Sequence, residues 1–118
     1  MRMLAALLCL AVGTGSQLVF ATDAPSASAK KEQGHAVFKR WCEPCHGRAT
    51  YLPATAGLAI KYQGKLPAAL EDRKDLTVEA VKTFVRHGAF SMPPFRKTEV
   101  SDADLDTLAA YLAGKPGR

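Results

Sequence analysis

The chain has 118 residues, of which 47% are hydrophobic and 23% are charged, and its formal net charge is +5. This length suits one small domain rather than two, and the composition excludes a fibrous or disordered chain. No run of lysine or arginine is longer than two residues, so the sequence gives no case for nucleic-acid binding. A domain this short has little core and often needs a bound metal, a disulfide or a large prosthetic group.

The N-terminal residues have the pattern of a secretory signal peptide. Met1–Met3 is a short basic start, Leu4–Val12 is a continuous apolar run, and small residues lead to Ala21. The apolar run is too short to span a bilayer comfortably, which disfavours a membrane anchor. We therefore predict export to the periplasm with cleavage after Ala21, and no membrane span in the mature chain. Residues 22–29 are then a flexible leader, and residues 30–118 form the folded domain.

Beyond this leader, apolar residues recur at helical spacing in short stretches. We predict helices over residues 30–41, 68–73, 78–87 and between Ser101 and Gly114, with a further helical turn over 56–62. Thr77 and Ser101 are suitable N-caps, and Gly88 is a suitable C-cap. Gly34 lies inside the first helix at a cost of roughly 0.8–1.0 kcal/mol relative to alanine, which is typical where another backbone comes close. We find no internal repeat and no convincing strand, so the fold class is all-α.

Cys42-Glu43-Pro44-Cys45-His46 is the attachment pattern of a c-type haem. Two thiols at this spacing can form thioether bonds with the two vinyl groups on one edge of a porphyrin, and the adjacent histidine can bind the iron. Cys9 leaves with the signal peptide, so Cys42 and Cys45 are the only cysteines of the mature chain. One covalently attached haem would also become the centre of the small core.

Met92 is the predicted second axial ligand of the iron. It is the only methionine after signal cleavage, it lies 46 residues after His46, and two prolines follow it. Met/His ligation is typical of electron-transfer haems, and it leaves no open position for a substrate. The chain is therefore expected to transfer single electrons and not to be an enzyme by itself. His35 and His87 compete for the ligand position less well, and we expect surface or capping roles for them.

The surroundings of the haem are less well marked in the sequence. The second imidazole nitrogen of a ligand histidine is usually anchored by a carbonyl, and we assign this role to Pro53. Four side chains could hydrogen-bond the haem propionates: Tyr51, Tyr62, Arg73 and Arg96.

Two other chemistries share parts of the cysteine motif. Trp41-Cys42-x-Pro44-Cys45 also resembles the motif of thioredoxin-type oxidoreductases, which would suit an exported protein. That fold needs a strand before the motif, whereas a helix precedes it here. A zinc site would need a second pair of ligands, and no further cysteine is present.

The mature chain resembles the class I cytochromes c, small all-α proteins with three to five short helices around one covalent haem. The residues that carry this resemblance are Gly34, Phe38, Cys42-x-x-Cys45-His46, Met92-Pro93 and Tyr111. In that family the first and last helices cross at such a glycine and aromatic residue. The resemblance therefore implies that Gly34 lies at a helix crossing.

A closer likeness covers most of residues 34–113 and points to the cytochrome subunits of flavocytochromes such as 4-cresol dehydrogenase and eugenol hydroxylase. It rests on the segments 41–47, 61–71 and 92–99. It implies a periplasmic hetero-oligomer in which a flavoprotein subunit with covalent FAD oxidises a 4-alkylphenol. This chain would take electrons from the FAD one at a time and pass them to a copper protein or another cytochrome. Phe90 and Phe95 are candidates for the face that such a permanent complex would bury. The alternative is a free, diffusible carrier that serves several partners.

Overall fold

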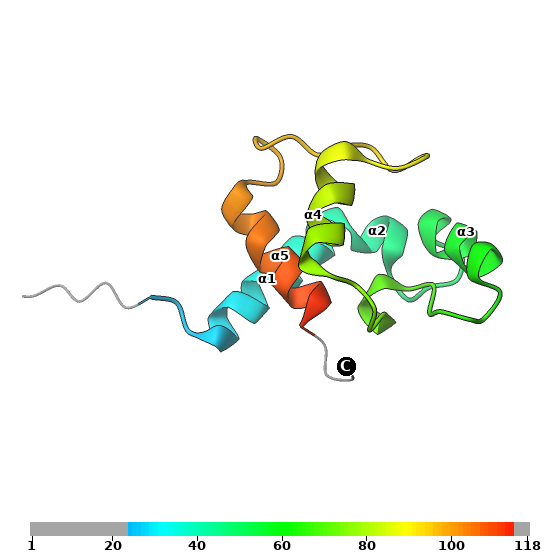
Figure 1. Cartoon of the computed structure of the whole chain (residues 1–118), viewed down its shortest axis with the longest axis horizontal. Coiled ribbons are helices and arrows are strands. Elements are labelled where there is room, and N and C mark those ends of the chain that lie inside the picture. Colours follow the sequence, from blue (N-terminus) through cyan, green and yellow to red (C-terminus); the bar gives the residue numbers. More distant parts are fainter. Residues whose placement is uncertain (1–23, 115–118) are drawn as a thin grey trace, which may run out of the picture.

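The computed structural model describes residues 24–114 (Figure 1). The elements in chain order are α1 (Ala27–Trp41), α2 (Glu43–His46), α3 (Pro53–Tyr62), the 3-10 turn η1 (Leu70–Asp72), α4 (Val78–His87) and α5 (Asp102–Ala113). The only β-type pairing within this range is an isolated bridge between Ala89 and Met92. The predicted all-α fold class is confirmed. No helix in the described range is long and apolar enough to cross a membrane.

The crossing of α1 and α5 is the centre of the fold (Figure 1). A Cβ atom placed on Gly34 would lie 2.7 Å from the Cβ of Tyr111 and 2.9 Å from the carbonyl carbon of Thr107. Both separations are too short for real atoms, so only glycine lets the two helices approach this closely. Phe38 and Leu108 are fully buried on the same two helices. The expected role of Gly34 at a helix crossing is therefore confirmed.

The hydrophobic core of the described residues lies where α1, α4 and α5 pack together. Its apolar side chains are almost completely removed from water, and burial of this kind is the main favourable contribution to folding. Cys42 is part of this core, so the first motif cysteine belongs to the packed interior. The members of the core are Val37, Phe38, Cys42, Val81, Val85, Val100, Leu105, Leu108, Ala109 and Leu112.

The helices over 78–87 and 102–113 form as predicted, because their start signals are local. The Thr77 side chain accepts a hydrogen bond of 3.1 Å from the Ala80 amide, and Ser101 accepts one of 3.1 Å from the Asp104 amide. These bonds satisfy amides that have no partner inside the helix. Gly88 ends α4 with a φ of +70°, a conformation that favours glycine.

Other predicted boundaries were wrong. Helix α1 begins at Ala27 rather than at residue 30, because the Ser26 side chain caps it with a 3.2 Å bond from the Ala29 amide. Helix α3 begins earlier than the predicted turn, with Pro53 at a first-turn position that suits proline. The predicted helix over 68–73 is only the short turn η1. The proposed signal peptide lies outside the described residues.

Candidate functional site

The motif residues lie on a single helical turn directly after α1. Cys42 ends α1, with its amide bonded to the Phe38 carbonyl at 2.8 Å, and it also begins α2. The amides of Cys45 and His46 donate to the Cys42 carbonyl at 3.1 and 2.8 Å. The sequence pattern did not reveal helix α2, since four residues are too few to show a period. This helix holds both thiols and the imidazole on one compact segment of backbone.

The two thiols are free, with Cys42 buried and Cys45 exposed. Burial, and then the neighbouring Cys45, raise the pKa of the Cys42 thiol to about 12. Thiol–disulfide catalysis needs a thiolate, and reactive cysteines accordingly have lowered pKa values. A helix leads into the motif, and residues 24–114 contain no sheet to support it. The site therefore does not support a thioredoxin-type oxidoreductase.

His46 presents an imidazole suited to binding a metal. Its Nδ1 atom is buried and has no hydrogen-bond partner among the described residues. Burial lowers the pKa of His46, which favours the neutral ring that coordinates metals. The predicted bond to the Pro53 carbonyl is absent. Pro53 is the first residue of α3, and a carbonyl at that position points along the helix toward its own next turn.

Met92 lies in a loop whose backbone is fixed on both sides. The amides of Ala89 and Met92 each bond to the other residue's carbonyl, at 3.1 and 2.9 Å. A Cβ on Gly88 would lie 2.5 Å from the Met92 carbonyl oxygen, so the loop closes tightly on that glycine. Farther along, the Phe95 amide donates to the Val85 carbonyl of α4 at 2.8 Å. The backbone that carries the Met92 thioether is therefore held in one place.

The structure brings the haem motif close to the loop that contains Met92, which we call the methionine loop (residues 88–95). Met92 is half-buried and packs against the core cluster that contains Cys42. Helix α3 packs against α2, and Lys61 near its C-terminal end lies 5.8 Å from the ring centroid of Phe90 in the methionine loop. Two free thiols, an imidazole with an unpartnered nitrogen and a half-buried thioether make a donor set that fits haem c.

Comparison with known families agrees with this donor set. Residues 29–112 match the family described as cytochrome C oxidase, cbb3-type, subunit III, a cytochrome c domain family. The chain belongs to this cytochrome c family. It is therefore an electron-transfer protein, and its family implies haem c as the cofactor. No curated protein and no solved structure matches the chain significantly.

The four side chains proposed as propionate partners occupy different surroundings in the cytochrome. Arg73 is buried, donates to Tyr62 Oη at 2.8 Å, and makes two bonds to the Asp75 carboxylate. These bonds, the hydrogen bonds to Asp75 above all, raise the pKa of Arg73. Arg96 pairs with Glu99 on the surface, and Tyr51 is exposed. The structure brings together only Arg73 and Tyr62, and a propionate role for any of the four stays a prediction.

The two remaining histidines contact residues other than the predicted iron ligands. His87 Nδ1 is 3.0 Å from the Thr83 carbonyl at the end of α4. This is the capping arrangement that we expected. His35 stacks against Tyr111 with the ring centroids 5.3 Å apart, and its Nε2 is 3.9 Å from the Glu71 carboxylate. His35 therefore belongs to a cluster around Glu71 that was not predicted.

Glu71 is a buried carboxylate that connects three parts of the cytochrome. Arg48, just after the motif, donates to Glu71 at 2.9 Å, and the Tyr111 hydroxyl of α5 donates to its other oxygen. Burial, and then the bond to Glu71, raise the pKa of Tyr111 to about 12. In the sequence, Glu71 begins a run of charged residues that reads as a solvated turn, so no local signal marked it. Thr55, a buried side chain on α3, was also missed.

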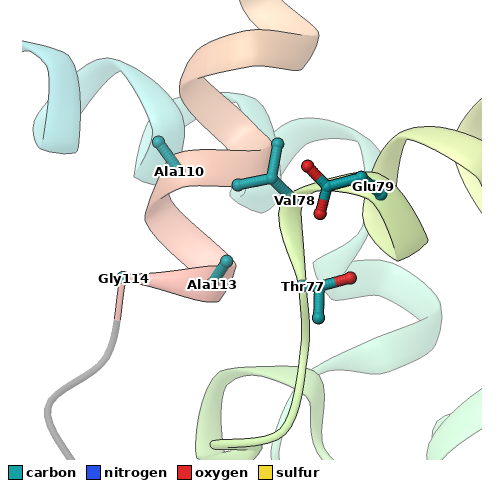
Figure 2. A pocket seen from close by; sticks show the side chains of 6 residues that line it. All are labelled: Thr77, Val78, Glu79, Ala110, Ala113 and Gly114. Carbon is teal, nitrogen blue, oxygen red and sulfur yellow. The ribbon is translucent and has the colours of Figure 1, made fainter. Parts of the chain in front are cut away.

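A hollow lies between the start of α4 and the end of α5 (Figure 2). It is lined by Thr77, Val78, Glu79, Ala110, Ala113 and Gly114. It contains no cysteine, histidine or methionine, and Glu79 is its only charged side chain. This hollow offers no ligand for a haem iron.

Proposed function

We propose that the cytochrome holds one haem c through thioether bonds from Cys42 and Cys45, with His46 and Met92 as axial ligands. The observation that carries this proposal is the single turn of α2, which presents two free thiols beside an imidazole with an unpartnered buried nitrogen. Bound haem supplies one-electron exchange between Fe(II) and Fe(III). The chain's own residues would hold these groups in place: Cys42 is part of the apolar core, and Met92 packs against it.

We further propose that the mature cytochrome is exported to the periplasm and is the subunit of a flavocytochrome. Its partner would be a flavoprotein that oxidises a 4-alkylphenol with covalent FAD, and its acceptor a copper protein or another cytochrome. The likeness of segments 41–47, 61–71 and 92–99 to such subunits supports this proposal. Helix α2 of the first segment packs against α3, and Lys61 of the second lies over Phe90, two residues before the third.

One of the two aromatic residues considered for docking fits a partner-binding role. Phe95 packs edge-on against Trp41, with the ring centroids 5.8 Å apart. Its ring therefore contributes to internal packing rather than to a docking surface. Phe90 is fully exposed at the tip of the methionine loop, and its backbone has a φ of +54°, unusual for a bulky residue. An exposed aromatic ring on a fixed loop is typical of an anchor residue at a protein interface.

The charges around Phe90 favour a partner with an acidic surface. Residues 44–70 and 80–98 contain no aspartate or glutamate. Most of their cations pair with acids elsewhere in the chain, for example Lys82 with Asp106. Lys61 and Lys65 form no ion pair among the described residues, and Lys61 lies over the Phe90 ring. We therefore expect carboxylates on the partner to face the end of α3.

Purification from the native source tests the subunit assignment. A complex that contains covalent FAD, and whose haem is reduced when a 4-alkylphenol is added, would support it. Phe90→Ala should weaken this complex at least tenfold, whereas Phe84→Ala, which alters a half-exposed ring on α4, should leave its affinity unchanged.

The alternative is a diffusible carrier that serves several redox partners. Transient redox complexes usually bury less than about 1,200 Å² in total, whereas permanent ones bury more. Recovery of the cytochrome only as a monomer, with no flavoprotein at low concentration, would favour this alternative and reject the flavocytochrome.

A further inference from the structure

Thr55 forms an unusual link between α3 and the motif helix. Its side chain is only 4% exposed, and it is the one buried residue of α3. Its hydroxyl donates to the Gly47 carbonyl at 2.7 Å and lies 3.3 Å from the Cys45 carbonyl. Thr55 lies in the first turn of α3, where a threonine hydroxyl usually bonds to the backbone of its own helix start. Here the bond goes to a different element instead.

The two carbonyls that Thr55 contacts stand on either side of His46. Helix α2 has only four residues, and its backbone bonds include those from the amides of His46 and Gly47 to carbonyls at the start of the turn, at 2.8 and 2.9 Å. Carbonyls at a helix end lack partners within the helix, and such a short helix is not stable alone. The Thr55 hydroxyl satisfies the end of α2 and ties it to α3.

We propose that Thr55 is the positioning residue for the axial histidine, a role that rests on the proposed ligation by His46. No hydrogen bond among the described residues holds Nδ1 of His46, so the ring's direction depends on the backbone that carries it. Thr55 fixes that backbone on both sides of the ring. Loss of the hydroxyl leaves two carbonyls without this donor and frees the end of α2.

Thr55→Val and Thr55→Ser, made in the haem-loaded protein, test this role. Valine keeps the branched shape without the hydroxyl, whereas serine keeps the hydroxyl. Hydrogen exchange at the amides of His46 and Gly47 should be about tenfold faster with valine and near the wild-type rate with serine. The amide of Val81 in α4, bonded to the Thr77 carbonyl at 3.1 Å, should not change.

Electron paramagnetic resonance tests whether the loss of the Thr55 hydroxyl also changes the orientation of the His46 imidazole. The electron paramagnetic resonance signal of the oxidised, low-spin haem should be broader in Thr55→Val than in the wild type, because the imidazole takes a wider range of orientations. Thr107→Val is the matched control. It removes a hydroxyl that donates to the Asp104 carbonyl at 2.9 Å within α5, and it should change neither measurement.

Each outcome decides the proposal. Wild-type exchange at His46 and Gly47 in Thr55→Val would overturn it, as would equal acceleration at Val81, which would show a general loss of stability. Thr55→Ala carries the same comparison if the valine variant does not accumulate. A wild-type protein without low-spin haem would instead reject the ligation by His46, while the amide rates would still show whether Thr55 holds α2.

Discussion

Replacing Gly34 by alanine tests how closely α1 and α5 must approach. The new methyl group would lie 2.7 Å from the Cβ of Tyr111 and 2.9 Å from the carbonyl carbon of Thr107, and it would be closer still to the carbonyl oxygen of Thr107. Ordinary contacts begin at 3.4 Å. These neighbours are backbone atoms or atoms next to the backbone, which cannot turn away as a flexible side chain would. The two helices must therefore move apart by roughly 1 Å.

The expected loss of stability follows from two opposing effects. Overpacking a tight core usually costs about 1–3 kcal/mol, and the upper part of that range applies because this crossing is the most extensive helix contact. Alanine gains roughly 0.8–1.0 kcal/mol over glycine inside a helix. The net loss should be about 2 kcal/mol, which corresponds to a melting temperature about 10 °C lower for a domain of this size.

Denaturant unfolding of the oxidised, haem-loaded protein measures this loss. Gly57→Ala is the matched control, because Gly57 lies inside α3 and a Cβ there would have no neighbour within 4 Å. That variant should be more stable by roughly 0.8–1.0 kcal/mol. If Gly34→Ala were as stable as the wild type, or gained stability as Gly57→Ala does, the close crossing would be refuted.

Two further substitutions probe the loop and the buried carboxylate. Gly88→Ala places a side chain at a φ of +70°, 2.5 Å from the Met92 carbonyl oxygen. It should lower stability by about 1–3 kcal/mol and weaken the sulfur-to-iron absorption band, and an unchanged spectrum and stability would contradict the tight loop. Tyr111→Phe removes the donor to Glu71 and should cost about 1.5 kcal/mol at neutral pH, measured by denaturant unfolding. Because the folded-state pKa of Tyr111 is raised from 10.0 to about 12, its contribution is complete below pH 10 and is lost as the pH rises toward 12. The stability difference between wild type and Tyr111→Phe should shrink over that window, and a constant difference would contradict the assignment.

Features set by neighbouring residues were predictable from the sequence. Helices α4 and α5 follow from their apolar periodicity, and their starts follow from the hydroxyl groups of Thr77 and Ser101. The haem motif was recognisable because Cys42, Cys45 and His46 must be adjacent in the chain to perform their chemistry. The order of residues along the chain was therefore enough to propose the two thiols and the imidazole as the haem-binding groups.

Features set by residues far apart in the chain were not predictable in the same way. The bond from Thr55 to the Gly47 carbonyl spans two helices, and a threonine early in a helix reads as a local cap. The partner of Glu71 is Tyr111, 40 residues away in the chain. The charged residues next to Glu71 indicated an exposed turn, so its burial was not predicted. The Pro53 assignment failed because the start of α3 determines the direction of its carbonyl. Only the folded arrangement supplies these partners.

Covalent haem attachment is tested by the mass of the denatured protein, produced in cells that attach haem to exported chains. We predict a chain that begins after Ala21 and carries one haem, which stays on the peptide that contains Cys42 and Cys45. A chain without haem and lighter by two hydrogens, from a disulfide between these cysteines, would contradict the assignment of a haem electron carrier and indicate thiol chemistry instead.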